Sequence, residues 1–422
     1  MEPIQIRSPV NATIKIPGSK SITHRALIAA GLASGVSRLK NVLICEDSLY
    51  TVNGLRELGI QITLKGDDAR IVGAGGKFSH FDHTKEIFLG NSGTSFRLLL
   101  STVALFQGEY ILSGTPRMQE RPIGGLVSAL SRMGIKASCP QKKGYPPVRI
   151  QSRGIPGGKV IITGNQSSQF ISSLLLAGPY AENAMEIEVT GQVVSRPYVD
   201  LTLEVMAHFG VGVIREDYNY YKIPPDKKYR SCRFSIEGDV SSASYFWAAA
   251  AVTGGTATTQ NIHPQNTLQG DIRFLDILEK MGCNVQSETT HVTVSGGQLC
   301  GVDADMNTMP DMVPTLAAIA IFAKGRTVIR NVAHLRHKES DRLNAVAREW
   351  NRLGGHIQEL PDGLIIQGDR KLHGTIADTH DDHRLAMALA VVGLNVPGLK
   401  IKNKDCVNKS FPRFWDLWKT LQ

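Results

Sequence analysis

The apolar and polar positions of this chain form one pattern that recurs along its length. Each occurrence begins with a helix-like run of small and apolar residues, followed by a Gly-containing turn, a strand-like segment and a second helix that ends near Leu-Gly or Met-Gly. The runs start at Ser21, Thr94, Ser167, Ser241, Val313 and Arg384. Because successive starts lie 71 to 74 residues apart, we interpret the chain as six copies of one structural unit.

The elements within a copy follow from its periodicity. After Leu58-Gly59, residues 60–64 alternate between apolar and polar, which predicts a strand. Each copy is therefore expected to contain a helix, a strand, a second helix and two strands, so the fold class is α/β. The sixth copy is short, and we expect the N-terminal strand segment, residues 4–16, to complete it.

The six copies predict two domains of three copies each. A chain of 422 residues with 42% hydrophobic residues is too long for one ordinary core. We place the domains at residues 18–230 and at residues 1–17 plus 231–422, so that the chain crosses between them twice. Two crossings favour a hinge with an interdomain cleft, which is a common place for a ligand. The first helix of each copy is apolar on every face and is expected to be buried.

The chain lacks the sequence patterns of membrane spans, signal peptides and cysteine-based metal sites. The apolar runs are far shorter than the ~18 residues of a membrane span, and residues 1–4 carry an acid where a signal peptide has a basic region. We therefore expect a cytoplasmic location. The six cysteines include no CxxC pair and no cluster with histidines. Reduced, mostly buried thiols are expected, without a metal site.

The charge balance is basic but dispersed. The chain has 47 Lys and Arg against 38 Asp and Glu, a formal net charge of +9, without a run of five basic residues. This balance is compatible with anionic small substrates, and it also leaves nucleic acid or an acidic membrane surface open. The sequence has no GxxxxGK[ST] and no GxGxxG after the first strand, so a standard nucleotide loop is not expected.

Polar motifs coincide with the predicted helix starts of the first domain. Unpaired backbone N–H groups and the helix dipole make such starts suitable for anions. Residues 17–21 (PGSKS) are followed by Arg25, residues 90–94 (GNSGT) by Arg97, and residues 166–169 read QSSQ. Each motif alone also fits an ordinary helix cap with solvated charges.

The second domain adds acids beside bases. Asp311 precedes the fifth helix run, and residues 336–342 (RHKESDR) are mostly charged. Residues 381–384 (DDHR) open the sixth run, and Lys409 follows. A single charge run is more often a solvated helix start with salt bridges, but several such motifs in one domain favour a site.

Taken together, these motifs resemble the enolpyruvyl transferase family and, more narrowly, its EPSP synthase branch (3-phosphoshikimate 1-carboxyvinyltransferases). The resemblance follows GSKS-x3-R, GNSGT-x2-R, ERPI, QSSQ, SRPY, KESDR, DHR and Lys409 in order over essentially the whole chain. It implies two domains of three βαβαββ units. It also implies enolpyruvyl transfer from phosphoenolpyruvate to the 5-hydroxyl of shikimate 3-phosphate with no cofactor, in the pathway to chorismate and the aromatic amino acids. We expect a monomer by default, because nothing in the sequence marks an interface patch.

The resemblance also implies roles for individual residues. Asp311 and Glu339 would be the acid/base pair, assisted by Lys20. Phosphoenolpyruvate would be held by Lys20, Gly93, Arg121, Gln169, Arg342, Arg384 and Lys409. Shikimate 3-phosphate would be held by Lys20, Ser21, Arg25, Ser167, Ser168, Gln169, Ser195, Tyr198, Asp311 and Lys338.

Two positions depart from the family pattern. His334 stands where the family often has Asn before the KE motif, which puts one substrate contact in doubt. Leu98 stands where Pro often follows GNSGT-x2-R. We expect glyphosate, a compact inhibitor of the phosphoenolpyruvate site, to bind because Gly93 is retained, but with weakened affinity because of Leu98.

Two other functions fit part of the pattern. The sister enzyme that acts on UDP-N-acetylglucosamine shares the repeat, but its first motif typically carries KNA and its mobile loop a reactive Cys, and residues 113–122 here contain no cysteine. A non-catalytic anion- or nucleic-acid-binding protein would use the net charge. It would leave Asp311 and Glu339 unexplained.

Overall fold

The chain packs as two compact units in a computed structural model that describes residues 9–421. The middle unit is Gly18–Ile236, and the terminal unit joins the N-terminal segment up to Pro17 with the chain from Glu237 onward. Residues 231–236, which the sequence boundary places in the second domain, pack with the middle unit. The reason is that β13 (Arg233–Ser235) pairs in parallel with β2 (Ser34–Lys40).

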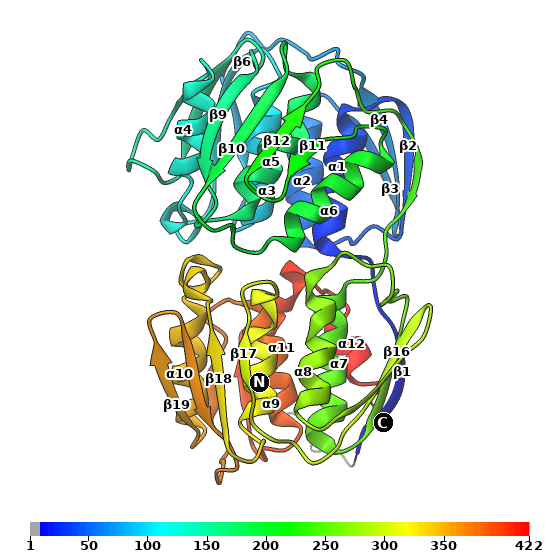
Figure 1. Cartoon of the computed structure of the whole chain (residues 1–422), viewed down its shortest axis with the longest axis vertical. Helices are drawn as coiled ribbons and strands as arrows, with labels where there is room; N and C mark the ends of the chain where they lie inside the picture. The colour runs from blue at the N-terminus through cyan, green and yellow to red at the C-terminus, as the bar shows by residue number, and fades with distance from the viewer. Residues whose placement is uncertain (1–8, 422) are drawn as a thin grey trace. The chain divides into compact units, whose positions relative to one another are not determined.

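A complete copy of the repeat is a four-stranded sheet with two helices (Figure 1). In the second copy the strands lie in the order β5-β6-β8-β7. The first two strands are parallel and the other neighbours antiparallel. These strands are β5 (Lys85–Phe88), β6 (Gly108–Ser113), β7 (Lys136–Ser138) and β8 (Val148–Ser152).

The other two sheets of the middle unit have the same order, β13-β2-β4-β3 and β9-β10-β12-β11. Their remaining strands are β3 (Gln61–Lys65), β4 (Asp68–Ala74), β9 (Gly158–Thr163), β10 (Met185–Thr190), β11 (Ile214–Glu216) and β12 (Tyr220–Ile223).

The terminal unit repeats this arrangement twice and then shortens it. Its sheets are β1-β14-β16-β15, β17-β18-β20-β19 and β21-β22. The strands are β1 (Asn11–Lys15), β14 (Thr256–Gln260), β15 (Asn284–Ser287), β16 (His291–Ser295), β17 (Asp303–Asp305), β18 (Arg326–Arg330), β19 (His356–Leu360), β20 (Gly363–Gln367), β21 (Ile376–Asp378) and β22 (Lys400–Lys402).

The expectation that residues 4–16 complete the sixth copy is wrong. Within the described residues, Asn11–Lys15 pairs in parallel with Thr256–Gln260 and is therefore the first strand of the fourth copy; residues 4–8 lie outside the described chain. The first copy in turn takes its first strand from Arg233–Ser235. The first and fourth copies are thus each completed by a strand that lies far away in the sequence, and the described part of the sixth copy keeps a two-stranded sheet.

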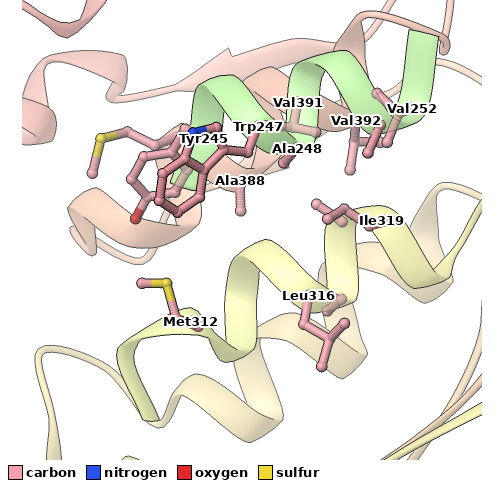
Figure 2. Packing of buried hydrophobic residues seen from close by; sticks show 14 of the residues in the cluster. Tyr245, Trp247, Ala248, Val252, Met312, Leu316, Ile319, Ala388, Val391 and Val392 are labelled. Atoms are coloured by element: carbon pink, nitrogen blue, oxygen red, sulfur yellow. The ribbon is translucent and has the colours of Figure 1, made fainter. Parts of the chain in front are cut away.

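The first helix of each copy is buried, as predicted. These inner helices are α1 (Lys20–Leu32), α3 (Gly93–Val103), α5 (Ser168–Ala177), α7 (Val240–Thr253), α9 (Val313–Ala320) and α11 (His383–Gly393), each beginning within one residue of the start read from the sequence. In the terminal unit, Trp247, Leu316 and Val391 come from three of them and share one core (Figure 2). The Trp247 indole N–H donates to Thr259 Oγ1 at 2.9 Å, so the ring is buried without losing its hydrogen bond.

The second helices are amphipathic or short. They are α2 (Glu46–Glu57), α4 (Gly124–Arg132), α6 (Pro197–His208), α8 (Phe274–Lys280), α10 (Arg342–Arg352) and α12 (Phe414–Trp418). The 3₁₀ helices are η1 (Met118–Glu120), η2 (Gly178–Tyr180), η3 (Gly270–Arg273), η4 (Pro310–Met312), η5 (Ala333–His337) and η6 (Lys404–Lys409). Helix α10 buries Leu343, Val346 and Trp350 and stops before Gly354, whose φ of +93° suits glycine.

All six cysteines are free thiols. Only Cys45 and Cys283 are buried and Cys300 is exposed, so the expectation of mostly buried thiols is wrong. Over residues 9–421, no helix combines the length and the apolar character needed to cross a membrane.

A fully buried carboxylate links α10 to the start of the sixth copy. Glu349 Oε2 accepts hydrogen bonds from Arg352 NH1 at 2.8 Å and from the Asp378 backbone N–H at 3.0 Å. Its Oε1 atom lies 3.1 Å from His380 Nε2. Because water does not reach this carboxylate, its partners depend on it for their hydrogen bonds.

We expect Glu349→Ala to lower the free energy of unfolding by about 3 kcal/mol, because it leaves a cavity and unmatched donors. Denaturant unfolding measures the change. Glu279→Ala, at an exposed position of α8, is the control and should stay within about 0.5 kcal/mol of the parent protein. Equal midpoints for the two variants would contradict the assigned role of Glu349.

Candidate active site

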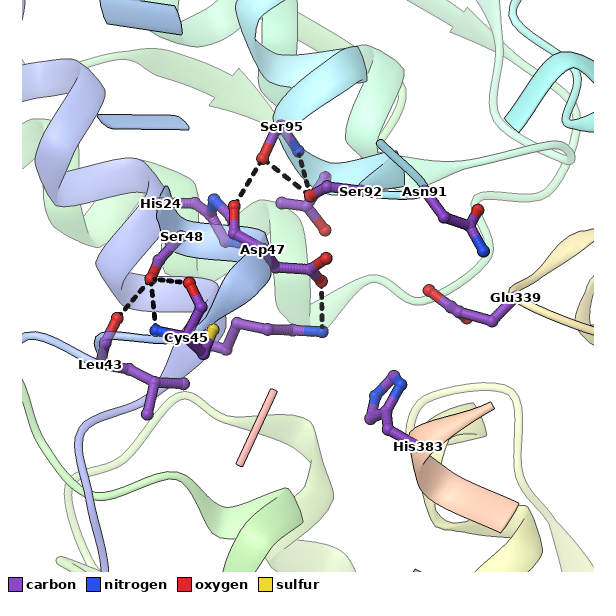
Figure 3. Close-up of polar contacts among 12 residues, drawn as sticks. His24, Leu43, Cys45, Asp47, Ser48, Asn91, Ser92, Ser95, Glu339 and His383 are labelled. Atoms are coloured by element: carbon purple, nitrogen blue, oxygen red, sulfur yellow. Dashed lines mark hydrogen bonds and ion pairs between the residues drawn. The ribbon is translucent and has the colours of Figure 1, made fainter. Parts of the chain in front are cut away.

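In the middle unit, a lysine is fixed at the start of α1. Lys20 Nζ lies 3.1 Å from Asp47 Oδ2, and the two side chains are 12% and 2% exposed (Figure 3). The chain reaches this point through Gly18, where a Cβ atom would lie 1.8 Å from the Asn41 carbonyl oxygen. Glycine therefore permits the turn, and the buried carboxylate holds the ammonium group at the helix start.

A chain of hydroxyl groups ties this lysine–aspartate pair to α3. Ser95 Oγ donates to the Asp47 carbonyl oxygen at 2.9 Å, and Thr51 Oγ1 donates to Ser95 Oγ at 2.9 Å. His24 Nδ1 lies 2.7 Å from Thr51 Oγ1. The sequence motifs include Lys20 but not these supporting residues, because single polar residues on helices carry no motif of their own.

Arg121 packs against the first residue of α3. A Cβ atom on Gly93 would lie 2.4 Å from Arg121 NH2, so a larger residue would displace the guanidinium group. Arg121 NH1 donates to the Asn91 carbonyl oxygen at 3.1 Å. The motifs GNSGT and ERPI, separate in sequence, thus meet at one helix start.

Gln169 joins α5 to α3. Its amide nitrogen donates to Thr94 Oγ1 at 3.0 Å, and its amide oxygen accepts from Arg97 NH1 at 2.9 Å. Ser167 caps α5 by accepting from the Gln169 backbone N–H at 3.2 Å, and Ser168 is the first residue of the helix. The Gln169 side chain is therefore fixed in one orientation.

Arg25 is buried between α1 and α6. Its guanidinium group donates to Thr202 Oγ1 at 2.8 Å and to the carbonyl oxygens of Ser21 at 2.8 Å and Tyr198 at 2.9 Å. Burial lowers the pKa of Arg25 to about 10, so it remains charged at neutral pH. Ser195 precedes α6 with φ of +55°. The expected residues Ser21, Arg25 and Tyr198 therefore lie together.

In the terminal unit, Asp311 lies between basic residues. One carboxylate oxygen is 2.8 Å from Arg342 NH1 and 3.8 Å from Lys338 Nζ, and the other is 2.7 Å from Arg384 NH2. Burial raises the pKa of Asp311, but Arg384, Lys338 and Arg342 outweigh that effect and hold the pKa well below its usual range. Asp311 is therefore ionised.

Arg342 also binds two further carboxylates. Its NH2 group is 2.7 Å from Glu339 Oε2, and its Nε is 2.7 Å from Asp382 Oδ2. Asp382 caps α11 by accepting from the Arg384 backbone N–H at 3.0 Å, and it accepts from Ser340 Oγ at 3.0 Å. Asp382 was not singled out as a site residue, although its place directly before a helix start is typical of a capping residue.

The remaining expected residues lie in the same unit. Lys409 is buried at the end of η6. His334 lies on η5, and burial together with Lys338 lowers its pKa to about 4, so the imidazole is neutral at neutral pH. Within residues 9–421, His334 Nε2 has no hydrogen-bond partner. No group of His, Cys, Asp and Glu in the described chain is arranged to hold a metal ion.

The two units therefore carry different chemistry. The middle unit presents cations and neutral donors at the starts of α1, α3 and α5, which suits phosphate and carboxylate groups. The terminal unit presents two acids, Asp311 and Glu339, on one buried arginine, which suits proton transfer beside bound anions.

The comparisons with known proteins agree with this chemistry. The family model described as EPSP synthase (3-phosphoshikimate 1-carboxyvinyltransferase) matches residues 4–418. Proteins named 3-phosphoshikimate 1-carboxyvinyltransferase match from Syntrophobacter fumaroxidans, at 45% identity over 100% of this chain and 99% of theirs, and from Sulfurovum sp., at 42% over 98% and 97%. A solved EPSP synthase structure from Acinetobacter baumannii matches with a TM-score of 0.80 and 27% identity, covering 99% of this chain and 97% of that one. The chain belongs to the EPSP synthase family of enolpyruvyl transferases.

Proposed function

We propose that the chain transfers the enolpyruvyl group of phosphoenolpyruvate to the 5-hydroxyl of shikimate 3-phosphate and releases phosphate, in the pathway to chorismate and the aromatic amino acids. The observation that carries this proposal is the pair of acids, Asp311 and Glu339, bound to the buried Arg342. The reaction requires one group that handles a hydroxyl proton and one that handles a carbon-bound proton beside several anionic groups.

The chemistry proceeds through a tetrahedral intermediate. The 5-hydroxyl oxygen forms a bond to C2 of phosphoenolpyruvate and gives up its proton, while the methylene carbon gains a proton and becomes a methyl group. Loss of phosphate from C2 and of one methyl proton then restores the double bond in the enol ether product. Glu339 serves the carbon-bound proton and Asp311 serves the 5-hydroxyl.

The pKa of Asp311 is lowered in the protein without bound substrates. Arg384, Lys338 and Arg342 hold the carboxylate ionised. When substrate phosphate and carboxylate groups approach these cations, part of the positive field is neutralised and the pKa of Asp311 rises. Substrate binding therefore makes Asp311 a better proton acceptor at the moment it is needed.

Each substrate is assigned binding residues from both units. We assign phosphoenolpyruvate to Lys20, Gly93, Arg121, Gln169, Arg342, Arg384 and Lys409. We assign shikimate 3-phosphate to Lys20, Ser21, Arg25, Ser167, Ser168, Gln169, Ser195, Tyr198, Asp311 and Lys338. Because each set takes residues from both units, the proposal requires the two units to act together during turnover, as in domain closure by a monomer.

We expect Lys20→Ala to lower kcat/KM for phosphate release by at least about 100-fold. The substitution removes a cation that stabilises negative charge in the transition state. The assay supplies phosphoenolpyruvate with shikimate 3-phosphate, and UDP-N-acetylglucosamine serves as the parallel acceptor. Lys65→Ala, on an exposed position of β3, is the control. Phosphate release with UDP-N-acetylglucosamine but not with shikimate 3-phosphate would identify the sister activity. Folded protein that releases no phosphate with either acceptor would favour a binding protein.

We expect Glu339→Gln to stop exchange of the phosphoenolpyruvate methylene protons with solvent, because the amide cannot deliver a proton to carbon. Proton NMR in deuterated water measures this exchange. The expected loss is about 100-fold or more. Exchange at the parent rate would show that Glu339 does not perform this step.

We expect glyphosate to inhibit and Leu98→Pro to tighten its inhibition. Leu98 is buried inside α3, and the Leu98 carbonyl oxygen accepts from Thr102 Oγ1 at 3.0 Å. A proline there removes a helix hydrogen bond and bends the segment that presents Gly93. Inhibition constants measured against phosphoenolpyruvate test this, and equal constants for both proteins would contradict the link between residue 98 and the helix start.

A further inference from the structure

A buried carboxyl group that the proposed chemistry does not use lies near Arg384 in the terminal unit. Asp271 is on η3 and is only 4% exposed. Its Oδ2 atom accepts a hydrogen bond from Ser241 Oγ, whereas its Oδ1 atom has no hydrogen-bond partner among residues 9–421. An ionised carboxylate with an unmatched oxygen is costly away from water, so this environment favours the protonated form.

Ser241 connects this carboxyl to the proposed site. Ser241 Oγ donates to Asp271 and lies 3.5 Å from Arg384 NH2. The same NH2 group is 2.7 Å from Asp311 Oδ2. Asp271, Ser241, Arg384 and Asp311 therefore form a continuous series of polar contacts, with the arginine between two carboxyl groups.

We propose that Asp271 is a positioning residue that acts through Ser241 on Arg384, and that phosphoenolpyruvate binds preferentially when Asp271 is protonated. The protonated form leaves the charge of Arg384 to be shared between Asp311 and the substrate. The ionised form adds a second negative charge beside the same guanidinium group and repels the anion. This inference rests on the proposed function, because it uses the assignment of Arg384 to phosphoenolpyruvate.

The neighbouring charges fix the range in which Asp271 titrates. Burial is the largest cause that raises its pKa, and Asp311 on η4 and Asp239 at the N-cap of α7 also raise it. Arg384 on α11 and the hydrogen bond from Ser241 lower it without cancelling these effects. The resulting pKa is about 7, so Asp271 changes charge near neutral pH.

The sign of the effect follows from this raised pKa. Below about pH 7 the neutral form predominates and anion binding is favoured; above it the ionised form predominates and binding weakens. If only the neutral form binds, the apparent KM rises about tenfold for each pH unit above the pKa. Asn at position 271 keeps an oxygen for Ser241 but does not titrate.

The test compares the parent protein with Asp271→Asn between about pH 6 and pH 9. We expect the parent KM for phosphoenolpyruvate to rise by about three- to tenfold from about pH 7 to pH 8 relative to the variant. For shikimate 3-phosphate, the ratio of the parent KM to the Asp271→Asn KM should be the same at every pH. Asp276→Asn, at an exposed position on α8, is the matched control and should follow the parent profile.

A second readout does not depend on turnover. The pKa of Asp271 is raised from 3.8 to about 7, so folding favours its protonated form. The melting temperature of the parent protein should therefore fall relative to that of Asp271→Asn as pH rises from about 4 to about 7. Above about pH 7 the difference between the two melting temperatures should stay constant. A constant difference in melting temperature, or parallel pH profiles of KM for phosphoenolpyruvate, would overturn the proposal. If the parent protein released phosphate with neither shikimate 3-phosphate nor UDP-N-acetylglucosamine, the proposed function would be overturned instead. The melting curves would still report the titration of Asp271.

Discussion

The terminal unit depends on one buried guanidinium group. Arg342, at the first residue of α10, is within 2.8 Å of three carboxylates, which belong to Asp311, Glu339 and Asp382. These acids come from η4, from the loop before α10 and from the cap of α11. Without the arginine, three carboxylates at the edge of a dry core would repel one another and lose their hydration without compensation. Arg342 therefore sets both the local fold and the positions of the two acids assigned to proton transfer.

The repeat explains why the polar motifs gather where they do. The inner helices α1, α3 and α5 share one core, so the middle unit places their starts within reach of one another through hydrogen bonds such as Gln169 to Thr94. The strands β13 and β1 each complete a copy whose other strands lie far away in the sequence. A sheet edge that would otherwise stay unpaired is covered in both units.

The sequence predicted the inner helices closely because their apolar runs and their polar starts are both local signals. It could not predict that residues 11–15 pair with the fourth copy, because a short strand carries no information about a partner far along the chain. The charged motifs likewise included Arg342 but not Asp47 or Asp271. A lone acid in a polar segment usually lies at the surface, and only the packed structure shows that these two are buried.

Three buried acids, of which the motifs missed Asp47, change how the cations assigned to substrate must be understood. Lys20 is paired with Asp47, Arg342 with Asp382, and Arg384 with Asp311, so none of these cations awaits a substrate as an isolated charge. An incoming phosphate or carboxylate has to compete with a carboxylate that is already in place. A singly charged ion gains little from that exchange, whereas a substrate with several anionic groups engages several cations at once. If these cations bind the substrates as proposed, selectivity depends on the number and geometry of buried ion pairs and not on the dispersed net charge of +9.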